Sequence, residues 1–171
     1  GAAAGTAVTT GINNVAIGYT ALASATTAAD NVIVGKQAGF NITDSQFNVG
    51  VGNNAIQTLT TGDRNVAVGH SAMYGLTTAS DNIAIGNEAG VAITTGIHNV
   101  LIGSYAGDAI TTGGYNVATG SGALGTNILG SASVAIGHSA LATQNYGSAT
   151  TALNTAVGHE AGAAVTTGVN N

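Results

Sequence analysis

The chain of 171 residues lacks cysteine and proline, and Lys36 and Arg64 are its only basic residues. Without cysteine it can form neither disulfides nor thiolate ligands. Nucleic-acid binding needs clustered lysine and arginine, so we expect no DNA or RNA partner. No uninterrupted apolar run of about 18 residues occurs, and we expect no membrane crossing within this segment. Charged residues are 5% of the chain, against ~25% in an average globular domain.

Large side chains are scarce as well. Tryptophan is absent and phenylalanine occurs twice, whereas glycine occurs 27 times. Hydrophobic residues reach 44%, but many of them are alanine. Such small side chains do not easily build one compact core. They can fill a thin core that repeats along an axis.

The chain does contain a short repeat: the pentad Asn-Val-Ala-Ile-Gly, or a close variant, returns every 17 residues. The pentads begin at Asn14, Asn31, Asn48, Asn65, Asn82, Asn99, Asn116, Ser133 and Asn154. The last interval is 21 residues, which places a four-residue insertion between Gly137 and Gly158. A fixed, short period predicts stacked repeats in which each unit contacts mainly its neighbours. We number each unit from position 1 at this first residue.

Each unit has the pattern of a short strand and a turn. Positions 2 and 4, as in Val66 and Val68, are branched apolar residues that share one face of an extended segment. Position 5 is always glycine, which predicts positive φ or a close backbone approach. Position 8 is always alanine, a tight inward site, and position 12 is mostly apolar, which predicts a second short strand. Residues 1–171 are thus expected to form one all-β domain, a parallel β-roll or β-solenoid of about ten 17-residue coils.

The asparagines at position 1 are expected to have a structural role. Stacked coils would place their side-chain amides in a ladder, each donating to the next. The expected ladder consists of Asn14, Asn31, Asn48, Asn65, Asn82, Asn99, Asn116 and Asn154.

Position 3 is uncharged and mostly small, and it gives the evidence about assembly. If positions 2 and 4 face the interior of the coil, position 3 faces away from it, and a strand that is apolar on both faces is normally covered on both. We therefore expect a homo-oligomer with an interchain seam at position 3. The seam residues would be Ala16, Ile33, Gly50, Ala67, Ala84, Leu101, Ala118, Ala135 and Ala156.

The polar residues show no catalytic, cofactor or metal pattern. Asp30, Asp63 and Asp81 precede the pentads at turns, where aspartate commonly accepts hydrogen bonds from local backbone groups. No calcium-loop spacing is present. We expect no enzyme activity, no cofactor and no metal.

Three histidines and one tyrosine are the remaining candidates for functional residues. His70, His138 and His159 each follow the position-5 glycine, and we expect exposed turn residues there. Insertions in a solenoid map to loops that often make contacts. Tyr146, in the four-residue insertion, is therefore the candidate for an external contact.

The pentad, with alanine three residues after its glycine, resembles the head repeats of trimeric autotransporter adhesins (YadA-like heads). The Thr-Thr-Gly before the pentad, as in TTGINNVAIG from Thr9, resembles repeats of phage tail fibres and large bacterial surface proteins. The resemblance covers essentially the whole chain. It implies a left-handed parallel β-roll with three chains around one axis, extended from a cell or virion. The regular 17-residue period and the Thr-Thr pair depart from the adhesin pattern.

Three functions are compatible with this pattern. The first is a structural rod of an extracellular, cell-surface or virion fibre that spaces or mediates attachment to a receptor or glycan. The second is an ice-binding β-solenoid with threonine ladders, which Asp44 and the pair Ile128-Leu129 interrupt. The third is an end-to-end filament: Gly1 and Asn171 both cut through the repeat, so we expect a segment of a longer fibrous protein whose open strand edges can pair.

Overall fold

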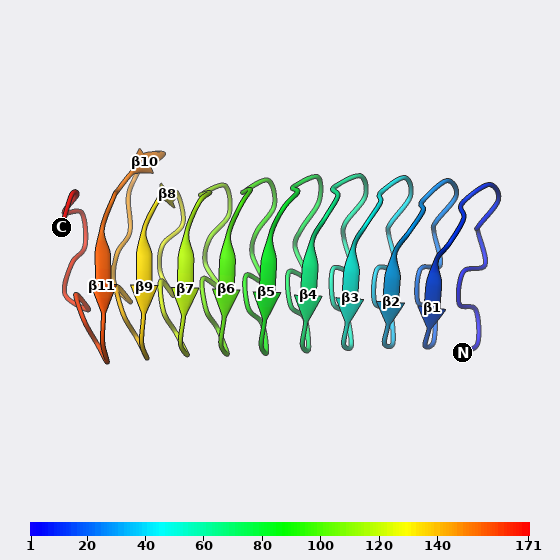
Figure 1. Ribbon diagram of the computed structural model, residues 1–171, viewed down its shortest axis with the longest axis horizontal. Helices are drawn as coiled ribbons and strands as arrows, with labels where there is room; N and C mark the ends of the chain where they lie inside the picture. Colours follow the sequence, from blue (N-terminus) through cyan, green and yellow to red (C-terminus); the bar gives the residue numbers. More distant parts are fainter.

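The computed structural model describes all 171 residues and shows a parallel β-solenoid without helices. Nine short strands form one parallel sheet in the order β1-β2-β3-β4-β5-β6-β7-β9-β11, which corresponds to about eight full turns (Figure 1). These strands are β1 (Val15–Ile17), β2 (Val32–Val34), β3 (Val49–Val51), β4 (Val66–Val68), β5 (Ile83–Ile85), β6 (Val100–Ile102), β7 (Val117–Thr119), β9 (Val134–Ile136) and β11 (Thr155–Val157). A separate two-stranded sheet pairs β8 (Gly130–Ser131) with β10 (Thr150–Thr151). The predicted fold class is confirmed. No helical segment with the length and apolarity of a membrane span is present.

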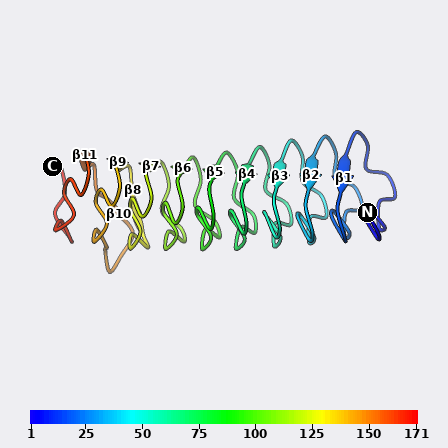
Figure 2. The same cartoon turned by 90° about the horizontal axis from the view of Figure 1, so that it is seen from below.

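Neighbouring coils stack in register, like on like. Ala67 of β4 pairs with Ala84 of β5, and Val68 pairs with Ile85. At ~4.8 Å per strand, the nine-stranded sheet is about 38 Å long. Figures 1 and 2 show the resulting rod, with its termini at opposite ends and the β10 loop projecting from the side.

Hydrogen bonds join the coils around their whole perimeter. Of 106 backbone hydrogen bonds, only 17 lie within the strands, so most of the contact between coils is outside the sheet. In the Thr-Thr segment, the N–H groups of Thr94, Thr95 and Gly96 all donate to the carbonyl of Thr111, at 3.0, 3.4 and 3.3 Å. Three consecutive donors on one acceptor make a turn rather than an extended ladder. The second strand predicted around position 12 is therefore wrong, and the short β8–β10 pair lies elsewhere, just before the pentads at Ser133 and Asn154.

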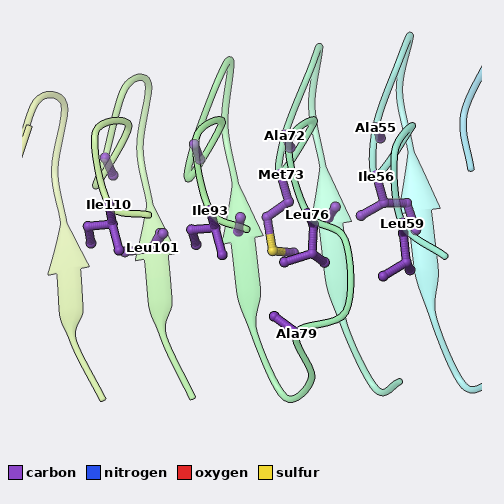
Figure 3. Close-up of a cluster of buried hydrophobic side chains, with 14 of the residues drawn as sticks. Ala55, Ile56, Leu59, Ala72, Met73, Leu76, Ala79, Ile93, Leu101 and Ile110 are labelled. Carbon is purple, nitrogen blue, oxygen red and sulfur yellow. The ribbon is translucent and has the colours of Figure 1, made fainter. Parts of the chain in front are cut away.

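Side chains at positions 3, 8, 9 and 12 fill the interior (Figure 3). The largest fully buried side chains are Leu22, Ile33, Ile42, Ile56, Leu59, Met73, Leu76, Ile93, Leu101, Ile110, Leu124 and Leu141. Position 8 is the tight inward site that the sequence predicts, as Ala72 and Ala89 show with no exposed surface. One continuous apolar column therefore runs along the rod.

The volume at position 3 is balanced by the volume at position 9. Leu101 occupies position 3 of a coil whose position 9 is Gly107, where an added Cβ would lie 2.7 Å from a Leu101 methyl carbon. In another coil the sizes are reversed: a Cβ on Gly50 would lie 2.8 Å from Cγ1 of Ile56. In an interior packed this closely, the summed volume of the side chains is constrained, whereas the identity of each residue can vary. The variation at position 3 therefore follows the core of the same chain.

The side chains of the strands face the opposite way from the prediction. Position 3 faces inward, as in Ala84, which is fully buried, whereas Ile83 and Ile85 on either side of it are 37% and 40% exposed. The reason is the buried asparagine at position 1, because alternate residues of a strand share a face and position 3 therefore follows position 1 inward. Positions 2 and 4 form the outside of the sheet.

Three positions of each coil have a left-handed backbone although residues other than glycine occur there. Examples are Glu88 at position 7, Met73 at position 9 and Asp81 at position 17, with φ of 53°, 48° and 64°. This conformation costs a non-glycine residue ~1 kcal/mol. Hydrogen bonds between coils offset the cost: Met73 N–H donates to the Ala89 carbonyl at 2.9 Å and Asp81 N–H to the Asp63 carbonyl at 3.1 Å.

Glycine at position 5 meets both requirements that the sequence predicts. Gly69 has φ of 142°, and a Cβ there would lie 2.3 Å from the carbonyl oxygen of Gly86 in the next coil. Both the backbone conformation and the contact exclude a side chain. The same pair of constraints recurs in each coil from Gly18 to Gly137.

We predict that Gly69→Ala lowers the free energy of unfolding by more than about 2 kcal/mol, because strain and a backbone clash add. Gly147→Ala is the matched control, since no atom lies within 4 Å of a Cβ at Gly147. Urea denaturation followed by circular dichroism measures both. Equal midpoints for the two variants would contradict the role given to position 5.

Candidate functional site

No pocket opens in the rod. The features that could have a function are rows of like side chains that run from coil to coil.

The asparagine ladder is confirmed, and it lies inside the coil. Asn82 is fully buried, and its Nδ2 donates to Oδ1 of Asn65 at 3.3 Å and to the Gly96 carbonyl at 2.9 Å. Its own Oδ1 accepts from the backbone N–H and the Nδ2 of Asn99, at 3.0 and 3.1 Å. Each amide thus joins consecutive coils through its oxygen and its nitrogen. These hydrogen bonds give the ladder a structural role.

Ser133 interrupts the ladder, and Gln144 bridges the interruption. Gln144 is fully buried at position 12, where most coils have an aliphatic residue. Its Nε2 donates to Oγ of Ser133 at 3.0 Å, and its Oε1 accepts from Nδ2 of Asn154 at 2.8 Å. The sequence does signal this bridge: in one coil, serine replaces the usual asparagine at position 1 and glutamine replaces the usual aliphatic residue at position 12.

Tyr146 is wrong as an external contact, because its side chain is only 7% exposed. Its hydroxyl donates to the Gly168 carbonyl at 2.8 Å and accepts from Nδ2 of Asn154 at 3.0 Å. Burial raises the pKa of the Tyr146 hydroxyl above its ordinary value, against the effect of the Asn154 hydrogen bond. The ring fills the wider coil that the insertion creates. The exposed residues of the insertion are the small residues 147–149.

The position-3 residues do not form a seam on the surface. All of them belong to or pack against the apolar core: Ala16, Ile33, Gly50, Ala67, Ala84, Leu101, Ala118, Ala135 and Ala156. A second chain cannot reach side chains that their own coil encloses. The predicted seam at position 3 is therefore wrong.

We call the outward residues at positions 2 and 4 the outer face. They are Val15, Ile17, Val32, Val34, Val49, Val51, Val66, Val68, Ile83, Ile85, Val100, Ile102, Val117, Thr119, Val134, Ile136, Thr155 and Val157. Every member is exposed or half-buried, none is charged, and all but two are valine or isoleucine. Continuous apolar surface of this kind marks interaction sites in soluble proteins. A parallel sheet is normally covered on both faces, and here only the inner face is covered by the chain itself.

The threonine pairs form two rows with different environments. At position 13, the hydroxyls are used within the chain: Oγ1 of Thr60 donates to the Thr77 carbonyl at 3.0 Å, and Oγ1 of Thr77 donates to the Thr94 carbonyl at 3.1 Å. At position 14, the side chains are exposed, and four consecutive coils have threonine there: Thr61, Thr78, Thr95 and Thr112. Only one row therefore faces water.

The turn aspartates contact the neighbouring coil. Oδ1 of Asp63 accepts from the backbone N–H of Gln46 at 2.8 Å, so its partner lies in the preceding coil and not in the local backbone that the sequence predicts. Asp81 instead accepts two hydrogen bonds from Arg64, to Oδ1 at 2.6 Å and Oδ2 at 2.9 Å. The hydrogen bond from Arg64 lowers the pKa of the Asp81 carboxyl. Arg64 is exposed and Asp81 is only half-buried, so the pair contributes little to stability.

Two of the position-6 histidines meet. His138 and His159 stack with ring centroids 5.0 Å apart and planes at 12°. Their donor atoms and a carboxylate oxygen of Glu160 all lie within 4.8 Å of one another. The sequence hides this cluster, because the 21-residue interval obscures that the coils of His138 and His159 are adjacent. His70 has no histidine beside it, since position 6 of the flanking coils is Asn53 and Asn87.

Comparison with known proteins found no matching family model, curated protein or solved structure.

We predict that Gln144→Leu lowers the free energy of unfolding by about 1–3 kcal/mol, because it leaves buried polar groups of Ser133 and Asn154 without a partner. Gln57→Leu is the control: Gln57 is half-buried and its side chain makes no hydrogen bond. Urea denaturation of both variants makes the comparison. A Gln144→Leu variant as stable as the control would show that the bridge is dispensable.

Proposed function

We propose that this chain is the structural, non-enzymatic rod of an extracellular or virion fibre, which spaces or mediates attachment to a cell surface, and that copies associate through the outer face. The observation that carries the proposal is the uncharged aliphatic character of that face over the whole nine-stranded sheet. A stiff β-solenoid with one apolar side is suited to a fibre and has little use as a solitary rod.

Burial of the outer face supplies the driving force for association. Each buried methylene contributes ~0.8 kcal/mol, and every coil offers two branched side chains. In-register stacking repeats the same pair of positions at each step, so coils of one copy can meet the same coils of another. Repetition of one contact by symmetry is the usual basis of homo-oligomers.

Three chains around one axis are the assembly that we favour. The resemblance of the pentad to trimeric adhesin heads supports this number, although the seam now lies at positions 2 and 4. Aromatic residues directly before the strands, Phe47 and Tyr115, are 55% and 60% exposed and can add to the contact. The receptor or glycan would be bound elsewhere on the fibre.

We predict that light scattering gives three times the chain mass of 16.4 kDa, and that the double variant Val68→Lys/Ile85→Lys reduces it to a single chain. Val68 and Ile85 are neighbours on paired strands, so the two lysines cost a monomer the modest repulsion of adjacent like charges. In an apolar interface they cannot be desolvated, and this larger cost prevents association. Tyr74→Lys, at an exposed tyrosine outside the strands, is the matched control and should keep the wild-type mass. A monomeric wild type at micromolar concentration would refute self-association.

Ice binding is the second candidate, favoured by the exposed row Thr61, Thr78, Thr95 and Thr112. Its weakness is that the neighbouring row at position 13 has its hydroxyls engaged with backbone carbonyls. A single row of threonine hydroxyls can match the ice lattice only along a narrow strip. The aliphatic outer face remains unexplained under this function.

We accordingly predict no thermal hysteresis at millimolar protein, measured by nanolitre osmometry. Thr78→Lys/Thr95→Lys serves as the comparison variant, because it interrupts the exposed row. Hysteresis in the wild type that this variant loses would reverse the order of the two candidates.

A further inference from the structure

The cluster of His138, His159 and Glu160 is not used by the rod. All three side chains are exposed, and none makes a hydrogen bond within the chain. The fold nevertheless holds their backbones together, because Gly158 N–H donates to the Ile136 carbonyl at 2.7 Å and Glu160 N–H to the His138 carbonyl at 2.8 Å. Two imidazoles and a carboxylate are thus presented side by side at one place on the rod.

We propose that His138, His159 and Glu160 bind a divalent transition-metal cation, with Zn²⁺ as the best match. Imidazole and carboxylate are common zinc ligands, and three protein ligands plus water complete a tetrahedral site. The two nitrogen donors disfavour Ca²⁺ and Mg²⁺, which select oxygen ligands.

The geometry needs only small side-chain movements. Two ligands 2.0–2.1 Å from a tetrahedral zinc ion lie ~3.4 Å apart, and the donor atoms of the cluster already lie within 4.8 Å. Stacked, exposed rings can close this gap by side-chain rotation while the coils stay in place. Glu160 has the left-handed backbone of position 7, with φ of 52°, and its carboxylate lies beside the two histidines.

The location gives the ion a consequence for the solenoid. His138 belongs to the coil with the insertion, and His159 belongs to the next coil. The ion would join the same two coils that Gln144 links through Ser133 and Asn154. Zinc should therefore stabilise the C-terminal coils, since a ligand that binds only the folded state shifts unfolding in its favour.

The test is calorimetric titration of ZnCl₂ into the untagged chain, with Co²⁺ as a spectroscopic probe of the ligand set. We expect one ion per chain and a visible Co²⁺ absorption band of a tetrahedral site. His138→Ser and His159→Ser should each weaken binding at least about tenfold, because the loss of second-shell partners alone costs 10- to 100-fold. Glu160→Gln should weaken binding less than either histidine variant and shift the Co²⁺ band.

His70→Ser is the matched control, at the same position of a coil without a histidine neighbour, and it should bind like the wild type. Serine occupies position 6 naturally at Ser104 and Ser121, so these variants are expected to fold, and circular dichroism verifies it. The proposal is overturned by any of three results: no binding to the wild type, equal binding to the His138→Ser/His159→Ser double variant, or one ion per two chains.

Discussion

The buried asparagine ladder is the interaction on which the rest of the solenoid depends. An amide that is fully buried must find partners for its oxygen and its nitrogen, because unmet buried polar groups cost ~1–3 kcal/mol each. Here the partners that join the coils are the same asparagine of the two neighbouring coils and a carbonyl 14 residues along the chain, as for Asn82 with Asn65, Asn99 and Gly96. This pattern fixes the 17-residue register. It also turns position 3 inward and positions 2 and 4 outward, so the apolar outer face follows from the ladder.

The repeat made the architecture predictable, but it did not predict which face of each strand lies inside the coil. Period, glycine turn, position-8 alanine and asparagine ladder can all be read from residues that recur at fixed spacing. The triplet Val-Ala-Ile is apolar on both faces, so alternation alone does not say which face is inside. Placing the larger residues inside is the usual choice, and it fails here because Leu76 and Met73, from positions 12 and 9, already fill the core. The ladder itself could have settled the matter, since Asn at position 1 shares a face with position 3.

The backbone conformation of the turns could not be predicted either, for a different reason. Position 17 is left-handed in every coil, yet it includes Asp81, His98 and Tyr115, which give no common turn signal. Their conformation is set by hydrogen bonds to the preceding coil, such as Tyr115 N–H to the Ile97 carbonyl at 2.9 Å. The Thr-Thr segment likewise has β-branched residues typical of strands, but the acceptor available in the next coil bends it into a turn. Interactions between residues 16 to 18 apart overrule local preference.

The insertion shows which part of the rod tolerates change. The coil from Ser133 departs from the repeat at several points, with Gln144 in the ladder and Tyr146 in the enlarged interior. β9 and β11 nevertheless pair in register across it, Ala135 with Ala156, as if no residues had been added. The extra length is taken up by the β10 loop, away from the main sheet (Figure 1). Strand pairing and the Gln144 bridge between Ser133 and Asn154 keep this side continuous within a single chain. The association that we propose through the outer face depends on this continuity, because a single displaced coil would misalign every contact beyond it.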